Sequence, residues 1–318
     1  MLPAIVFDME SMVSAVEEPL SELMRQFPLH DVIVMSRSIE RALHADLSRA
    51  LEEKRKHDRC IVFLTTYGGD PDAGYRIARC LRHHYKHVRL MIPSFCKSAG
   101  TLITICANEV VIGDRGELGP LDVQVMKSSE LAERSSGLDI IQALQAGLDH
   151  VQQAFRQSLM DIRSGGRLST KLAGEFASKI AVGVAAPLYA QIDPNRLGEM
   201  QRAMRIAHEY GQRLDKYSHN LKPGALDRLV AEYPSHSFVI DRKEATELFV
   251  RVLHPTQAEV DFCRTIWTVV ETESGLGPLI FTDDPSSKGE LDGTESEEGL
   301  GEGGETATSA DGHTDAPA

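Results

Sequence analysis

Two short stretches of the chain combine residue types that suit the attack on a carbonyl group. Gly68 and Gly69 directly follow an apolar run, and glycines there allow a sharp turn that leaves backbone N–H groups uncovered by any Cβ. Ser98 follows the next apolar run and precedes Ala99, where a short helix is expected to begin. N–H donors from both stretches that converge on one oxygen would form an oxyanion hole. The position of Ser98 is thus compatible with a nucleophile for acyl transfer and with a helix cap.

Structural roles are the favoured explanation of the same residues when spacing is the sole guide. Serine is a preferred N-cap residue, and Gly-Gly is a common turn. Lys97 suggests a serine/lysine dyad, but adjacent side chains of an extended or turning chain point apart, so we do not expect it to be the base. His83, His84 and His87 lie near the end of an arginine-rich helix and are expected to be solvated.

The elements that must position these stretches alternate between strand and helix. Strands are expected at 32–35, 60–66, 88–92 and 109–113, amphipathic helices at 39–51 and after Pro71, and a short apolar helix at 99–107. This alternation predicts parallel pairing, and open sheets of this kind bind ligands at the carboxyl ends of their strands. Both stretches follow neighbouring strands, so they are expected to face one crevice.

The pattern changes after Gly137. Apolar residues at steps of three and four predict one long helix over 138–162, a second helix over 197–214, and an extended piece with a helix in "SHSFVIDRKEATELF". We divide the chain into an N-terminal segment, an α/β core that carries the nucleophile, a mainly helical completion of the same domain, and a disordered acidic tail, with bounds at 1–30, 31–137, 138–282 and 283–318.

Composition narrows the possible functions further. The net charge is −13, but residues 283–318 contain eleven acidic residues and one lysine, so the body is nearly neutral and offers no basic surface for nucleic acid. The five cysteines are scattered and show no metal-ligand or disulfide spacing, which favours a cytoplasmic setting and no metal. No apolar run approaches the length of a membrane span, and no G-x-G-x-x-G follows a strand, so neither a membrane span nor an organic cofactor is expected.

Four blocks of the sequence together resemble the serine dehydrogenase proteinase family, which is related to Clp proteases and signal-peptide peptidases in the Clp/crotonase superfamily. The blocks are "LTTYGGDPDAGYRIARCL", "IPSFCKSAGTLITICANEVVIGDRGELGPLDVQ", "APLYAQIDP" and "YPSHSFVIDRKEA". The resemblance covers most of residues 30–250. It implies an α/β fold with a Clp/crotonase-like core of repeated β-β-α and βαβ units, followed by a mainly helical C-terminal part.

The resemblance also implies the members of a catalytic site. It makes Ser98 the nucleophile, places the oxyanion donors at Gly68, Gly69 and Ala99, and points to Asp122 and His236 as the other members of a triad. No histidine occurs between His87 and His150, so the base cannot follow the serine as closely as in Clp proteases. The order serine, aspartate, histidine agrees with the altered order described for the family, and triads are recognised by geometry.

Several assignments stay open at this point. Asp122 would also fit as a turn residue after Gly-Pro-Leu, and His236 would also fit as a capping or surface histidine. Asp241 is an alternative residue to orient the imidazole. Lys127 is a second candidate for the base, because signal-peptide peptidases use a lysine from a nearby loop.

We therefore expect a serine endopeptidase that cleaves peptides or unfolded proteins without a cofactor. The resemblance implies a homo-oligomer, and we expect its contacts to include Leu148, Val151 and Phe155. The chain contains no P-loop, so whether a separate ATPase delivers substrates stays open. Two alternatives are a crotonase-like enzyme that acts on an acyl-thioester and a catalytically silent scaffold or adaptor.

Overall fold

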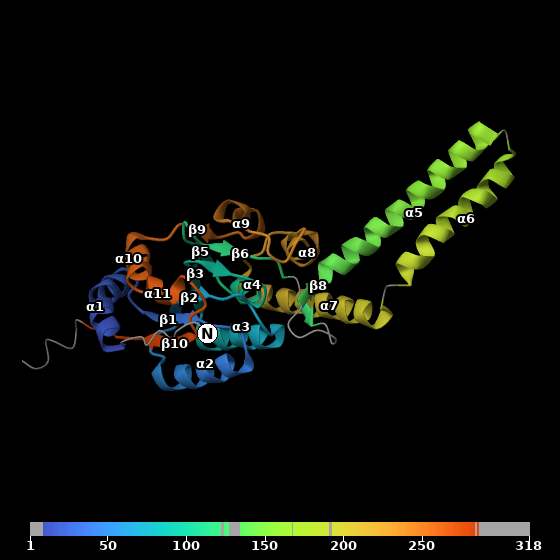
Figure 1. Cartoon of the computed structure of the whole chain (residues 1–318). Helices are drawn as coiled ribbons and strands as arrows, with labels where there is room; N and C mark the ends of the chain where they lie inside the picture. The colour runs from blue at the N-terminus through green and yellow to red at the C-terminus, as the bar shows by residue number, and fades with distance from the viewer. Residues whose placement is uncertain are drawn as a thin grey trace, which may run out of the picture.

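A six-stranded sheet forms the centre of the molecule (Figure 1). The computed structural model describes residues 9–121, 124–126, 134–166, 168–190, 193–283 and 285. The strand order is β10-β1-β2-β3-β5-β9, and every neighbouring pair is parallel except β10 with β1. The strands are β1 (His30–Ser36), β2 (Arg59–Thr65), β3 (His87–Ile92), β5 (Glu109–Ile112), β9 (Val252–Leu253) and β10 (Leu276–Phe281). Two small sheets pair β4 (Phe95–Cys96) with β6 (Glu117–Leu118) and β7 (Gln124–Met126) with β8 (Arg134–Ser136).

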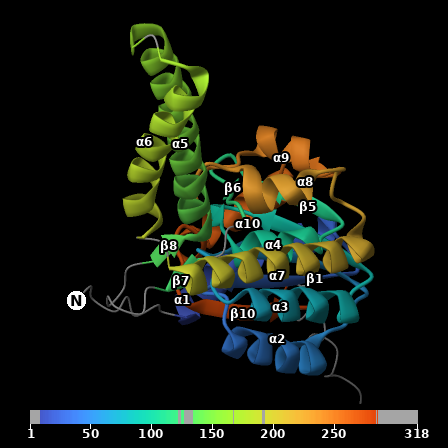
Figure 2. The same cartoon turned by 90° about the vertical axis from the view of Figure 1, so that its right-hand side faces the viewer.

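Helices cover both faces of the sheet, which confirms the predicted α/β fold (Figures 1 and 2). One face packs against α2 (Arg41–Lys54), α3 (Pro71–His84), α4 (Ala99–Ile105), α7 (Pro194–Ser218), α8 (Ala225–Asp227), the π-helical turn Arg228–Glu232 and α9 (Arg242–Leu248). The other face packs against α1 (Met9–Gln26), α10 (Gln257–Thr265) and α11 (Trp267–Val270). The helices α5 (Gly137–Gly166) and α6 (Thr170–Tyr189) extend away from this body.

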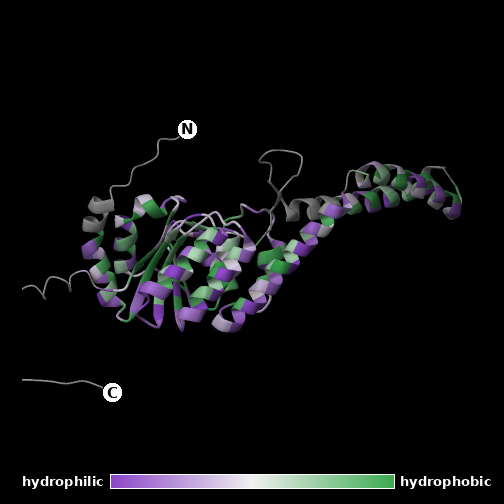
Figure 3. Ribbon diagram, turned by 90° about the horizontal axis from the view of Figure 1, so that it is seen from below, coloured by the Kyte–Doolittle hydropathy of each residue, from purple (hydrophilic) through white to green (hydrophobic). Residues whose placement is uncertain are grey.

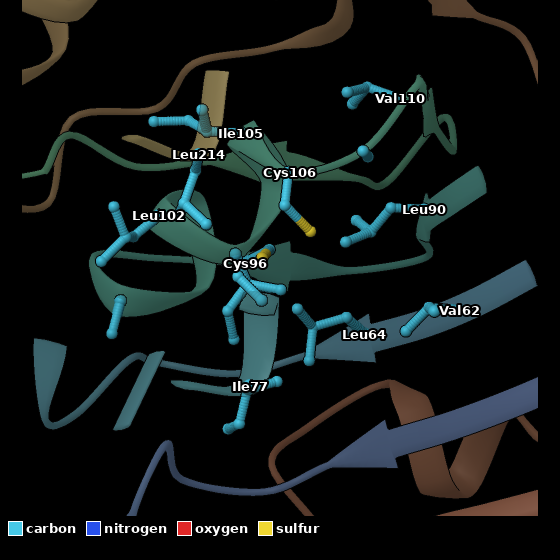
Figure 4. Packing of buried hydrophobic residues seen from close by; sticks show 14 of the residues in the cluster. Val62, Leu64, Ile77, Leu90, Cys96, Leu102, Ile105, Cys106, Val110 and Leu214 are labelled. Carbon is cyan, nitrogen blue, oxygen red and sulfur yellow. The ribbon is translucent and has the colours of Figure 1, made fainter. Parts of the chain in front are cut away.

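The central strands are mainly apolar because both of their faces are buried. In β1, Ile33 and Met35 point into one core cluster, while Val32 and Val34 point into the other. Successive side chains of a strand alternate between faces, so a strand between two helical layers is mainly apolar on both of its faces. Figure 4 shows how side chains from the strands and from α3, α4 and α7 meet in the first of these clusters.

Local sequence signals fix the start of α3, which follows the glycine turn. Pro71 occupies the first helical turn, and the Asp70 side chain accepts a hydrogen bond from the Asp72 N–H at 2.9 Å. Proline and an aspartate cap are both favoured at these positions. The helix therefore begins at a defined residue and limits the turn to a few residues after β2.

The helices α5 and α6 pair side by side as a projecting hairpin (Figures 1 and 3). In α6, the small residues Ala173, Ala177 and Ala181 are buried at steps of four, which lets the two helices approach closely. Larger apolar residues of α6 also recur at steps of four, but they are exposed: Leu172, Phe176, Ile180 and Val184. Figure 3 shows apolar and polar residues alternating around this hairpin.

The predicted elements agree with the structure except near the ends of the body. The helix expected over 138–162 is α5, and the helix expected over 197–214 lies within α7. Residues 138–282 were expected to be mainly helical, yet β10 adds an antiparallel strand to the sheet edge, where Ile280 pairs with Ile33. The glycines and proline of "GLGPLIF" hide this strand from a periodicity argument.

The predicted acidic tail lies almost wholly outside the described residues. Asp283, at its start, contacts the Lys56 ammonium at 2.5 Å. Within the described part of the chain, no helix has both the length and the apolar character needed to cross a membrane.

Candidate active site

Two loops at the carboxyl ends of β2 and β3 are joined directly to each other. The Thr66 N–H donates to the Phe95 carbonyl at 3.0 Å, and the Lys97 N–H donates to the Thr66 carbonyl at 2.9 Å. These bonds continue the parallel pairing beyond the main sheet, through β4. The glycine turn after β2 and the serine turn before α4 are therefore held side by side, as the topology predicted.

Ser98 has a backbone conformation that serine rarely adopts. Its φ is 50° and its ψ is −114°, and its side chain makes no capping hydrogen bond to α4 although it occupies the N-cap position. A positive φ costs a non-glycine residue free energy, and such residues concentrate at functional sites. A capping role therefore does not explain this serine. The conformation is compatible with a nucleophile at a sharp strand-to-helix turn.

The glycine turn presents one open N–H group toward the same region. The Gly68 N–H, one of the predicted oxyanion donors, donates to Thr66 Oγ1 at 3.0 Å in this structure. Within the described part of the chain, the N–H groups of Gly69 and Ala99 donate to no protein acceptor. These two remain as candidate donors. The missing side chain of Gly68 also makes room for Ser98.

Ser98 and His236 line the same cavity, although they are far apart in the sequence. The cavity has a volume of about 370 Å³. His236 is half-buried and lies in a turn between the π-helical turn and α9. The remaining lining residues are mostly apolar, with two carboxylates among them: Ser38, Ile39, Glu40, Tyr67, Gly69, Asp70, Pro71, Ala99, Leu102, Leu121 and Ala207.

The other predicted site residues have different outcomes. Asp241, the alternative residue predicted to orient the imidazole, is exposed and caps α9, because its Oδ1 accepts the Glu244 N–H at 2.7 Å. Asp122 and Lys127 lie outside the described residues. Leu121, the residue before Asp122, lines the cavity. The Lys97 ammonium contacts Glu117 at 2.6 Å, which agrees with the expectation that it is not the base.

Cys96, two residues before Ser98, is a second nucleophile in the sequence. Its side chain is fully buried, and burial raises the pKa of the thiol to about 12. The thiolate is the reactive form of cysteine, so Cys96 is not reactive near neutral pH. Its sulfur instead packs in the core beneath α4 (Figure 4). Among the described residues, no group of three or more histidines, cysteines or acids is placed to hold a metal ion.

Glu273 belongs to this region and was not found by sequence reasoning. Its Oε1 accepts hydrogen bonds from Thr66 Oγ1 at 3.0 Å and from the Tyr67 N–H at 3.1 Å. Thr66 Oγ1 in turn accepts the Gly68 N–H. The carboxylate therefore fixes the glycine turn from the C-terminal part of the chain. No local motif marks this residue, since the segment around it is a short turn of polar residues.

A family comparison agrees with this geometry. Residues 29–141 match the family described as ClpP-like SDH-type serine proteinase, and this span contains both loops. The match confirms the resemblance to that family, and at the level of the family it supports a serine peptidase. His236 lies beyond the matched span.

Individual relatives are distant. Two uncharacterized proteins of Methanocaldococcus jannaschii are similar: MJ0137 is 30% identical over 80 residues, and MJ1495 is 31% identical over 64 residues. These alignments cover 25% and 20% of this chain, and 28% and 22% of the relatives, so the chain matches about a quarter of their length.

Solved structures give two further similarities. Both are mutants of the 1510-N membrane-bound stomatin-specific protease, one with serine replaced by alanine and one with lysine replaced by alanine in complex with a substrate peptide. Each has 17% sequence identity and a TM-score of 0.30, and each covers 48% of this chain. The coverage of the two solved chains is 75% and 68%.

Proposed function

We propose that this chain is a serine endopeptidase with Ser98 as its nucleophile. The proposal starts from the match of residues 29–141 to ClpP-like SDH-type serine proteinases. One observation supports the assignment most directly. Ser98 has a strained backbone, does not cap its helix, and lines one cavity together with His236. A nucleophile and a base in a shared cavity are the first requirement for acyl transfer.

In the proposed reaction, Ser98 Oγ attacks the carbonyl carbon of a peptide bond while His236 accepts the hydroxyl proton. The negative charge that develops on the carbonyl oxygen is stabilised by the N–H groups of Gly69 and Ala99, and each donor of this kind contributes roughly 3–4 kcal/mol. The imidazolium then gives its proton to the leaving amine. Water attacks the acyl-enzyme, His236 accepts its proton, and Ser98 is released with its own proton restored.

Asp122 remains our proposal for the residue that orients His236. Asp241 is already used as the cap of α9, and Lys127 is retained as the second candidate for the base. The proposed substrates are peptides or unfolded proteins, since the mainly apolar cavity suits an extended chain with an apolar side chain. A cytoplasmic location and a homo-oligomer are further parts of this proposal.

A serine-directed fluorophosphonate probe tests the assignment. We expect the probe to label Ser98, with the site located by mass spectrometry of peptides. Ser98→Ala should abolish both labelling and hydrolysis of an unfolded, fluorescently quenched protein. Ser94→Ala is the matched control, because the Ser94 hydroxyl lies near the same turn but donates to the Glu271 carbonyl at 3.0 Å.

The same experiment separates the alternatives. Turnover of an acyl-thioester without labelling would indicate a crotonase-like enzyme. Absence of labelling and of all turnover would indicate a silent scaffold. His236→Ala should slow labelling of Ser98 strongly, and an unchanged rate would remove His236 from the proposed mechanism.

A further inference from the structure

The Lys97 side chain lies beside the proposed nucleophile in the sequence, and its ammonium contacts three oxygen atoms. Its Nζ lies 2.6 Å from Glu117 Oε1, 3.2 Å from the Leu118 carbonyl and 3.4 Å from the Phe238 carbonyl. The side chain is 12% exposed. A lysine ammonium has three N–H donors and no acceptor, so these three oxygens account for all of its protons.

The three acceptors belong to the segments that carry the rest of the proposed site. Glu117 and Leu118 form β6, which leads to Leu121 at the cavity. Phe238 lies two residues after His236. The backbone of Lys97 belongs to the serine turn itself, since its carbonyl accepts the Gly100 N–H at 2.8 Å. Lys97 thus adds side-chain contacts among three segments that the pairing of β4 with β6 and of Leu118 with Ile240 also joins.

The segment of His236 is irregular, because residues 234–239 form neither a helix nor a strand. Phe238 packs against Tyr233 with ring centroids 4.9 Å apart, and the adjoining Ile240 forms a pair of hydrogen bonds with Leu118 of β6, at 2.9 and 3.0 Å. Gly119 leaves space for the lysine, because a Cβ at that position would lie 2.6 Å from Lys97 Cδ. The absence of a side chain at Gly119 therefore makes room for the Lys97 side chain.

We propose that Lys97 is a positioning residue, which fixes the His236 segment and β6 relative to Ser98 and takes no proton itself. This inference rests on the proposed function for its catalytic consequence. The Glu117 carboxylate orients the ammonium, and the two carbonyl groups set its distance from each segment. Without the ammonium, the imidazole would keep its chemistry but lose its position beside Ser98.

Lys97→Met tests the inference, because methionine keeps most of the apolar stem and removes every donor. The rate of fluorophosphonate labelling at Ser98 should fall about a hundredfold, the loss typical of a displacement of about 1 Å in an active site. The pH at which the rate is half-maximal should stay unchanged, because the base is the same. Lys97→Arg, which restores a cation with donors, should recover part of the rate.

Lys86→Met is the matched control. Lys86 also forms an ion pair, with Asp58 at 2.6 Å, but it is exposed and lies at the start of β3, away from the cavity. Its variant should label at the wild-type rate. Hydrogen exchange measured by mass spectrometry gives a second readout that needs no activity, and peptides covering 235–240 should exchange faster in Lys97→Met than in Lys86→Met.

The outcomes distinguish this inference from the proposed function. Labelling of Lys97→Met at the wild-type rate, or a shifted pH midpoint that shows Lys97 itself titrating, would overturn the positioning role. If the wild-type protein is not labelled, the proposed function fails, and hydrogen exchange then decides the inference alone. Unchanged exchange in 235–240 would overturn it.

Discussion

Gly68 lies so close to Ser98 that a β-carbon on the glycine would be 2.8 Å from the β-carbon of the serine. The same atom would lie 2.9 Å from the Lys97 carbonyl oxygen. Neither neighbour is the flexible end of a side chain, so the serine turn would have to move. The absence of a side chain at Gly68 is thus a condition for the position of Ser98.

Gly68→Ala should therefore impair the site more than the fold. Gly68 has a φ of 107°, and a left-handed residue other than glycine costs about 1–3 kcal/mol of stability. We expect labelling of Ser98 to fall about a hundredfold because the nucleophile is displaced. Gly224→Ala is the control, since Gly224 also has a positive φ, 78°, but has open space around its Cα. If both variants label equally fast, the contact with Ser98 is unimportant.

Glu273→Ala should loosen the glycine turn from the opposite side. The variant leaves the buried Thr66 hydroxyl and the Tyr67 N–H without their acceptor, which should lower the free energy of unfolding by about 1–3 kcal/mol. Labelling of Ser98 should slow as well, because the Gly68 peptide depends on Thr66. Glu273→Gln retains an acceptor oxygen and should stay near wild type. The exposed Glu271 gives the control, Glu271→Ala, and urea unfolding measures the stability of all three.

His30 should make the folded protein less stable in mild acid. It is 8% exposed, and burial, aided by nearby Arg59 and Arg89, lowers its pKa below the ordinary value of 6.5. Between that lowered pKa and 6.5, the unfolded chain binds a proton that the folded chain does not, so stability falls as the pH drops through this range. The contribution is fully present above pH 6.5.

Urea unfolding at several pH values between 5 and 7.5 checks this expectation. His30→Asn keeps a donor for the Pro28 carbonyl, which His30 Nδ1 contacts at 3.1 Å, and should reduce the dependence of stability on pH. His254→Asn, at an exposed histidine, should leave the dependence unchanged. An identical pH dependence in wild type and His30→Asn would show that His30 does not titrate differently on folding.

The hairpin of α5 and α6 is the surface where we expect subunit contacts. Of the three residues first predicted for this role, Leu148 is exposed, while Val151 and Phe155 are half-buried. Phe155→Asp would therefore disturb the hairpin itself. Phe176, which is 45% exposed on α6, is the better probe.

We expect Phe176→Asp to lower the mass measured by light scattering, because a charge would interrupt the exposed apolar stripe. Ser178→Asp adds the same charge to an exposed position on another side of α6 and should leave the mass unchanged. A wild-type protein with the mass of a monomer would contradict the assembly prediction directly.

Removal of residues 286–318 should change neither thermal stability nor labelling, because a segment of this composition has little apolar surface to bury. Removal of 283–318 also deletes Asp283, whose half-exposed ion pair with Lys56 contributes at most about 1 kcal/mol. A large fall in melting temperature for the shorter deletion would show that the tail packs against the body.

The sequence by itself determined the α/β core and the position of the serine turn. Strands such as β2 are apolar at successive positions, and α2 and α3 carry clear stripes, so local patterns are sufficient to predict these elements. The position of Ser98 between an apolar strand and a short apolar helix is equally local. Pattern and spacing also located the long helices α5 and α7, because amphipathic periodicity over many turns is a strong signal.

Only the tertiary structure decided which residues surround Ser98. The placement of Ser98 and His236 at one cavity depends on how α7 and the turn after it return to the sheet, and no spacing in the sequence encodes that path. The same holds for Glu273, which reaches Thr66 from the far end of the chain, and for Gly68, whose N–H is used by a hydroxyl two residues away. A side chain's hydrogen-bond partner depends on distances of a few ångströms in three dimensions. Sequence patterns fix elements and faces, but they do not fix those distances.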